Sequence, residues 1–310
     1  MAGAIEKVEQ DLAKMDDKVA QLREKSHKIY SSYLETLGQA VRQQLILAAY
    51  HLCTHTYPDR FLSLSVSERE KLQKSIRQVG SSAQEELTSL LEKLETASES
   101  SETEDKAADG DSHQETTNES DGSDDPTMPP NGQSEEKATE FGESQVSQVR
   151  EQLLGEDPVH PFAAWLEKVE SAISNLLHNS SYEANRVLKQ AQVFMPELPD
   201  PILEMALHSN ANADTSGPPN VINLYVQAED PHQSHQSQKK GEPIPITVIA
   251  LHLAELEFAD SQVMAQRNQL RQLMSQFSQL KQSYEQKQQE WLVATAEANW
   301  RAIWFEESRS

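Results

Sequence analysis

Apolar side chains in the first part of the chain recur at alternating spacings of three and four residues. This spacing is typical of a helix that packs an apolar seam against another helix in a coiled coil. An ordinary surface helix is the alternative, but it usually has a wider apolar stripe. The seam has one polar member and consists of Ile5, Val8, Leu12, Met15, Val19, Leu22, Ser26, Ile29 and Tyr33. Beyond residue 34 the stripe widens, so we expect that half to contact more than one neighbour.

The sequence around Pro58 predicts the end of this helix and the start of a second one. Proline interrupts the helical hydrogen-bond pattern and disfavours helix at the preceding residue. Two pairs with the spacing of a capping box follow, Ser65 with Glu68 and Ser67 with Glu70. Because the connection is short, we expect residues 66–94 to fold back antiparallel onto residues 30–57. Residues 1–94 are therefore predicted to form a long helix and a helical hairpin.

Residues 95–145 are predicted to be a disordered acidic linker. They contain 16 acidic and 2 basic side chains and almost no large apolar ones. Such a segment cannot bury enough apolar surface to offset the entropy of an ordered chain.

Residues 146–243 are predicted to form a small central module. Pro161 suits the first turn of a helix, and Ser180 with Glu183 has the spacing that caps another. The segment 221–227 alternates apolar and polar residues with several β-branched and aromatic ones, which predicts a strand. The first helix is expected to bury Phe162, Trp165 or Leu166, Val169, Ile173 and Leu177.

Residues 244–310 are predicted to form a long glutamine-rich helix of coiled-coil character. The three-and-four alternation continues for about seven heptads, more than the three or four that indicate a coiled coil. Residues 244–249 are either the start of this helix or the antiparallel partner of the strand at 221–227, and the β-hairpin is slightly favoured. The seam also contains the polar residues Gln266, Lys287 and Arg301.

Composition limits the environment and the partners of the chain. Its formal net charge is −23, and this charge repels phosphate backbones and anionic lipid headgroups, so we expect no nucleic-acid partner. The longest apolar runs are shorter than the roughly 20 residues that span a bilayer, so no membrane insertion is expected. The single cysteine, Cys53, cannot form an internal disulfide, and residues 1–12 lack the apolar stretch of a signal peptide. These features predict a cytoplasmic protein.

The charges beside the first seam bear on how it pairs. If Ile5 occupies heptad position a, a parallel homodimer places Asp11 against Asp16 and Lys18 against Arg23. Each like-charge pair costs a few tenths of a kcal/mol. Antiparallel or intramolecular pairing is therefore favoured, with the C-terminal helix as the candidate partner.

The sequence contains no motif that predicts catalysis. No two glycines lie closer than ten residues apart, which excludes the common glycine-rich phosphate loops and the nucleophile elbow. His51 and His55 have a spacing that can hold a metal, but no glutamate follows His51 as in metalloproteases. We therefore predict no catalytic residue, no cofactor, no metal site and no enzymatic activity.

An aromatic cluster near the C-terminus is the strongest indication of a binding surface. Tryptophan is enriched among the residues that dominate the energy of protein interfaces. The alternative is that these rings seal the helix onto the central module. Together with the first seam, the candidate partner-binding residues are Trp291, Trp300, Trp304, Phe305, Leu12, Val19 and Leu22.

These patterns predict a mainly α protein with long coiled-coil-like helices at both ends. Between them lie a disordered acidic linker and a small central helical module, which in one interpretation includes a β-hairpin. This architecture favours a non-enzymatic protein–protein interaction protein, an adaptor, scaffold or assembly factor, that binds protein partners or itself through its helices. Two alternatives are a small ligand-binding or catalytic module in residues 146–254 with helical appendages, and an acidic chaperone for a basic client.

Overall fold

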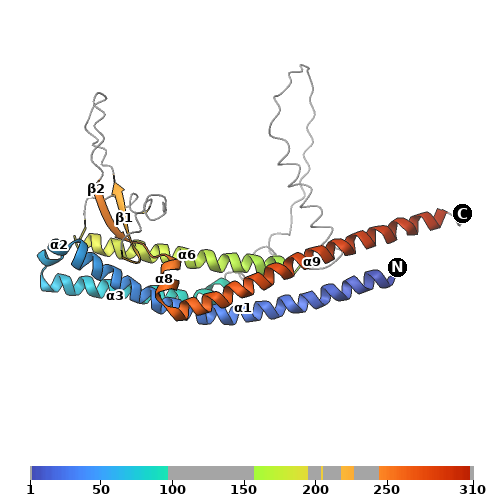
Figure 1. The fold of residues 1–310 in the computed structure, drawn as a ribbon, viewed down its shortest axis with the longest axis horizontal. Helices are drawn as coiled ribbons and strands as arrows, with labels where there is room; N and C mark the ends of the chain where they lie inside the picture. Colours follow the sequence, from blue (N-terminus) through green and yellow to red (C-terminus); the bar gives the residue numbers. More distant parts are fainter. Residues whose placement is uncertain (1, 97–156, 195–203, 205–217, 227–243, 308–310) are drawn as a thin grey trace, which may run out of the picture.

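The computed structural model describes residues 2–96, 157–194, 204, 218–226 and 244–307 and shows a mainly helical fold (Figure 1). The predicted linker, residues 95–145, lies outside the described residues except at its start. The helices and turns are α1 (Ala2–His51), η1 (Leu52–Thr56), α2 (Pro58–Ser63), α3 (Val66–Thr88), α6 (Val159–Gln190), α8 (Leu253–Ala259) and α9 (Ser261–Glu307). The strands are β1 (Val221–Val226) and β2 (Ile244–Ile249). None of the helices in these ranges combines the length and apolarity of a membrane-spanning segment.

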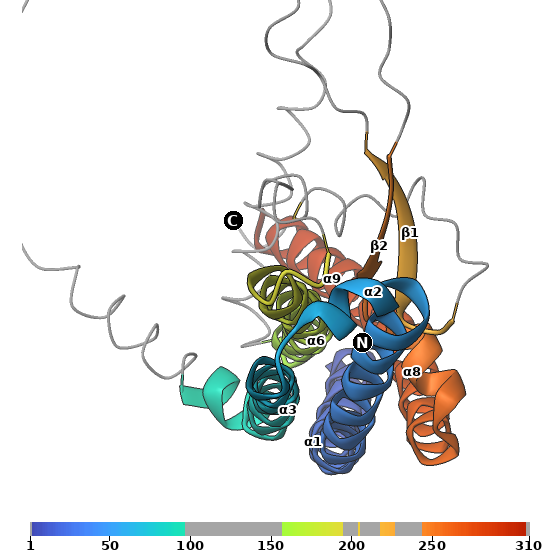
Figure 2. The same ribbon diagram turned by 90° about the vertical axis from the view of Figure 1, so that its left-hand side faces the viewer.

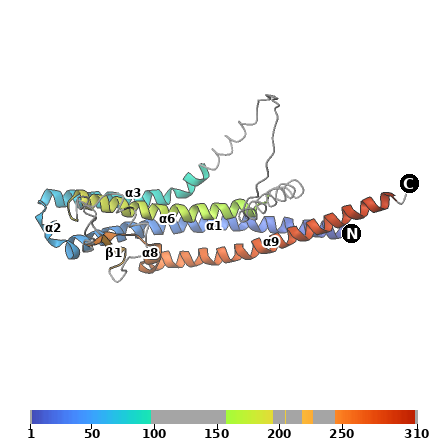
Figure 3. The ribbon, with the colours of Figure 1, turned by 90° about the horizontal axis from the view of Figure 1, so that it is seen from above.

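The long helices pack lengthwise around α1, which contacts α3, α6 and α9 (Figures 1 and 2). The ends of α1 and α9 that carry the chain termini lie at the same end of the bundle (Figure 3). There α1 and α9 continue past the start of α6 as a two-helix extension, which we call the distal arm, residues 2–15 and 285–307. The apolar core is therefore shared by four helices along most of its length and by two in the distal arm.

The contact between α1 and α9 is antiparallel and lies within one chain. Trp291 donates from Nε1 to Oε1 of Glu9 at 3.0 Å, and Gln266 donates from Nε2 to Oγ of Ser32 at 2.8 Å. Both helices bury a side chain at every seventh position, as the sequence spacing predicts. These positions are Leu12, Val19, Ser26, Tyr33 and Ala40 in α1, and Val263, Leu270, Phe277, Tyr284 and Trp291 in α9.

The predicted fold-back of residues 66–94 onto α1 is confirmed. Helix α1 ends in the π-helical turn η1, and α2 begins at Pro58. Of the two candidate capping boxes, the one at Ser65 forms: its hydroxyl accepts from the backbone of Glu68, and the Glu68 carboxylate accepts from the backbone of Ser65 at 2.7 Å. Helix α3 runs to Thr88, and residues 90–96 are again helical.

Two glycines set the distance between α1 and α3. A Cβ atom on Gly80 would lie 3.1 Å from Cγ and 3.3 Å from Cα of Arg42. A Cβ atom on Gly38 would lie 3.2 Å from Cα of Gln84. The backbones of the two helices therefore approach at both sites more closely than larger residues allow.

The predicted break at Ser180 is wrong. Helix α6 runs without interruption from Val159 to Gln190, and the hydroxyls of Ser180 and Ser181 donate to backbone carbonyls four residues earlier, at 2.7 Å and 2.8 Å, instead of capping a new helix. Neither proline nor glycine lies nearby to end the helix. The predicted inner face is confirmed, with Leu166 rather than Trp165 fully buried.

The sequence left open whether residues 244–249 start the C-terminal helix, the boundary assigned to it at 244–310, or form the slightly favoured hairpin. Residues 244–249 form β2, which pairs antiparallel with β1 in the register Val221↔Ile249. The outer edge of β2 is bonded by side chains of the bundle: the Tyr57 hydroxyl accepts from N of Thr247 at 2.9 Å, and the Asn185 amide bonds both N and O of Ile249. The favoured hairpin interpretation is therefore confirmed and a helix from residue 244 is wrong, and the hairpin is fixed to the end of the bundle.

Candidate functional site

Most of the predicted partner-binding residues lie inside the contact between α1 and α9. Leu12, Val19 and Trp291 retain 6%, 2% and 5% of their exposure, and Leu22 is half-buried against the same core. A side chain that is buried by its own chain is not available to a partner unless the helices separate. The structure therefore brings these four residues together as a core.

Trp300 lies differently from Trp291, although both belong to α9. Its side chain is 66% exposed on the distal arm. The backbone of Trp304 and Phe305 belongs to α9, but their side chains lie outside the described residues. Of the predicted aromatic cluster, Trp300 is thus the described member that is exposed to solvent.

The sequence did not predict the residues around Trp300 that face away from α1. Val293 lies seven residues before Trp300, on the same side of the helix, and is 49% exposed. It lines a shallow depression on α9. We call the outer face the set formed by Gln286, Gln289, Glu290, Val293, Ala294, Glu297 and Trp300. Apolar residues are sparse among the glutamines and glutamates of this face. Their spacing is therefore much weaker than that of the buried seam and did not predict a surface.

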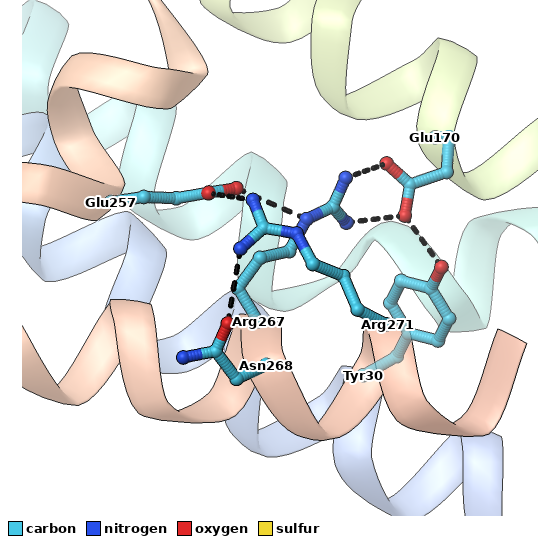
Figure 4. A network of polar contacts seen from close by, with 6 residues as sticks. All are labelled: Tyr30, Glu170, Glu257, Arg267, Asn268 and Arg271. Atoms are coloured by element: carbon cyan, nitrogen blue, oxygen red, sulfur yellow. Dashed lines mark hydrogen bonds and ion pairs between the residues drawn. The ribbon is translucent and has the colours of Figure 1, made fainter. Parts of the chain in front are cut away.

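A polar network ties α1, α6, α8 and α9 together (Figure 4). Arg267 of α9 donates two hydrogen bonds to Glu170 of α6, from Nη1 at 2.6 Å and from Nη2 at 2.9 Å. Tyr30 of α1 donates to the same carboxylate at 2.6 Å. Glu257 of α8 lies 3.0 Å from Nε of Arg267 and 2.5 Å from Nη2 of Arg271. The four elements are thereby fixed relative to one another at one point along the bundle.

The electrostatics of this network favour a structural role. Burial by itself lowers the pKa of Arg267, but the hydrogen bonds and charge of Glu170 outweigh it and raise that pKa above its ordinary value. Burial also raises the pKa of Tyr30, and the nearby Glu170 carboxylate adds to the increase. General acid–base chemistry needs a group that titrates near the working pH. Neither Arg267 nor Tyr30 does so, and both keep their usual charge.

His51 and His55 stack on each other near the end of α1. Their ring centroids are 4.7 Å apart with planes 7° apart. Burial lowers the pKa of His51, and the neighbouring His55 adds to the decrease. Cys53 between them is buried, and burial raises its pKa to about 11, so the thiol is not activated as a nucleophile. In the described ranges no three His, Cys, Asp or Glu side chains are grouped to hold a metal.

Asp16 lies where the distal arm joins the bundle. Burial raises the pKa of its carboxyl group, a hydrogen bond with Tyr284 opposes the increase, and the charges of Asp157 and Asp17 add to it. The charged form of Asp16 is therefore disfavoured in the folded protein.

Comparison with protein families, with curated proteins and with solved structures gives no match for this chain. Its function must therefore be argued from its own residues.

Proposed function

We propose that this chain is a non-enzymatic interaction protein, an adaptor, scaffold or assembly factor, whose protein partner binds the outer face of α9. The observation that carries the proposal is the exposure of Trp300 and Val293, at 66% and 49%, on an arm that projects beyond α3 and α6. Exposed tryptophan contributes a large contact area with few rotatable bonds to immobilise.

The burial of the seam supports this choice of surface. Leu12, Val19 and Trp291 are covered within the chain, so a partner that leaves the fold intact must bind elsewhere. The regular seven-residue burial on α1 and α9 supports coiled-coil packing of the arm. A two-helix coiled coil accepts a third amphipathic helix along its side, and the partner is then a helix with apolar residues facing Val293 and Trp300.

A site-specific cross-linker at position 293 tests the proposal. Val293→p-benzoylphenylalanine in the full-length chain, irradiated in its source cells, is expected to give a discrete adduct with one protein or with a second copy of the chain. The same reagent at Gln262, which is exposed at the start of α9 and lies outside the distal arm, is the matched control. Trp300→Ala should abolish the adduct and leave the helical circular dichroism unchanged.

The opposite results are equally clear. A chain that sediments as a monomer over a wide concentration range and forms no adduct at 293 is inconsistent with the proposal. Equal adducts from positions 262 and 293, or an adduct that is unaffected by Trp300→Ala, also contradict it.

The other expectations have less support. In the described parts of residues 146–254 the Asn185 amide is used in structural bonds with Ile249, and Nε2 of His252 is buried without a hydrogen-bond partner. A single such atom does not favour a catalytic module there. The acidic chaperone rests on residues 95–145, which lie almost entirely outside the described ranges. The cytoplasmic location and the lack of a nucleic-acid partner stay predictions from composition.

A further inference from the structure

A pocket lies at the elbow between α1 and α3, far from the distal arm. It has a volume of about 370 Å³. Its walls come from the end of α1, the π-helical turn η1, α2 and the first turns of α3. Volumes of roughly 300–1,000 Å³ are usual for sites that bind small molecules. We call this cavity the elbow pocket.

The local structure holds the walls of the elbow pocket in place. Arg69 donates from Nε to the carbonyl of Phe61 at 3.2 Å and from Nη2 to that of Leu62 at 2.6 Å. Its guanidinium also lies 5.5 Å from the centroid of the Phe61 ring. The capping box at Ser65 starts α3 immediately afterwards. The pocket is thus formed before any ligand binds, and the π-helical turn in its wall is a feature frequently found at functional sites.

The lining is apolar inside and positive at one point. Ala49, Cys53, Leu72 and Ile76 each retain 7% or less of their exposure. Arg77 contributes the positive charge, and no Asp or Glu belongs to the lining. In the described part of the chain Arg77 forms no ion pair.

We propose that the elbow pocket binds a small amphipathic carboxylate, with its hydrocarbon part against Ala49 and Ile76 and its carboxylate at Arg77. A guanidinium binds a carboxylate through two charge-assisted hydrogen bonds, and an apolar chain gains by leaving water. A carboxylate ligand matches the one charge in the lining, which is notable in a chain whose net charge is −23. Binding is non-covalent, since the buried Cys53 thiol is protonated at neutral pH.

Decanoate, with decan-1-ol as its uncharged counterpart, is the probe that tests this proposal on the full-length chain. Below its micelle-forming concentration, decanoate is expected to raise the melting temperature, as any ligand of the native state must. Arg77→Gln should weaken decanoate binding about tenfold, the usual effect of losing a charge-assisted hydrogen bond, and leave decan-1-ol unaffected. Lys74→Gln, an exposed α3 position outside the lining, is the matched control and should bind normally.

The pocket itself is tested by filling it. Ile76→Trp, or the milder Ala49→Leu if the first variant loses helical circular dichroism, should abolish decanoate binding.

Three results would overturn the assignment. They are no stabilisation by decanoate, undiminished binding to a folded filled variant, and equal binding to Arg77→Gln and wild type. Each is independent of the outer face of α9, because neither Arg77 nor Ile76 belongs to it.

Discussion

Replacing Arg267 with methionine tests whether the polar network holds the bundle together. Methionine keeps much of the length of the side chain but removes the charge and all the donors. Glu170 then loses two hydrogen bonds at 2.6 Å and 2.9 Å, and Glu257 loses an ion pair at 3.0 Å. Glu257 is 7% exposed but keeps Arg271 at 2.5 Å, whereas Glu170 is 26% exposed and keeps Tyr30 as its hydrogen-bond partner within the described ranges.

The loss of unfolding free energy depends on how far each carboxylate is left buried without a positively charged partner. Removing one member of a fully buried ion pair costs about 3–5 kcal/mol, because an uncompensated charge stays behind. Partial exposure of Glu170 and the remaining Arg271 partner of Glu257 lessen that cost. We expect Arg267→Met to lower the free energy of unfolding by about 2–3 kcal/mol, less than the loss of a fully buried pair. For a domain of this size the melting temperature should fall by about 4–12 °C.

Thermal and urea unfolding, followed by circular dichroism at 222 nm, measure this change. Arg186→Met is the matched control: Arg186 pairs with Glu183 on α6, but both side chains are largely exposed at 50% and 41%. That loss should stay below about 0.5 kcal/mol. Adding Glu170→Gln to Arg267→Met should recover about 1–2 kcal/mol relative to additivity, because the stranded charge is removed. A loss from Arg267→Met no larger than the control, or strict additivity of the double variant, would refute the reasoning.

Three further predictions concern other parts of the bundle. Trp291→Ala should lower the free energy of unfolding, measured by urea denaturation, by about 3–5 kcal/mol, because it opens a cavity in the seam. Trp300→Ala should change the same free energy by less than about 0.5 kcal/mol. Similar costs for the two variants would contradict their different burial. The pKa of Asp16 is raised in the folded state, so ionisation of its carboxyl group is disfavoured there. The contribution of Asp16 to the free energy of unfolding therefore grows as the pH falls through the folded pKa and is complete below the unfolded pKa. Asp16→Asn should therefore be more stable than wild type at pH 7, and this advantage should shrink on acidification in matched unfolding curves; a constant difference contradicts the assignment. Gly80→Leu should destabilise the hairpin by about 1–3 kcal/mol in the same assay through overpacking, while Gly3→Leu, with nothing within 4 Å of its Cβ position, should be close to neutral.

Local sequence chemistry was sufficient to predict the long helices and where two of them meet. Pro58 ends the first helical segment wherever it lies in the fold, since the missing N–H is a property of the residue. Ser65 and Glu68 satisfy each other's backbone groups within one turn, so their spacing alone indicates the cap. The seven-residue repeat that includes Leu12 and Trp291 identified side chains that require cover, because helical periodicity places them on one stripe.

Only the tertiary structure decided what covers each stripe and what remains open. Ser180 has the spacing of a cap, but its hydroxyl bonds inside a helix that the neighbouring helices stabilise by packing. Residues 244–249 are a strand because β1, Tyr57 and Asn185 bond their backbone. Trp291 is covered by α1, whereas Trp300 lies on the outer face. Periodicity fixes which residues share a side of a helix, but contacts between residues distant in sequence determine whether that side is buried or exposed.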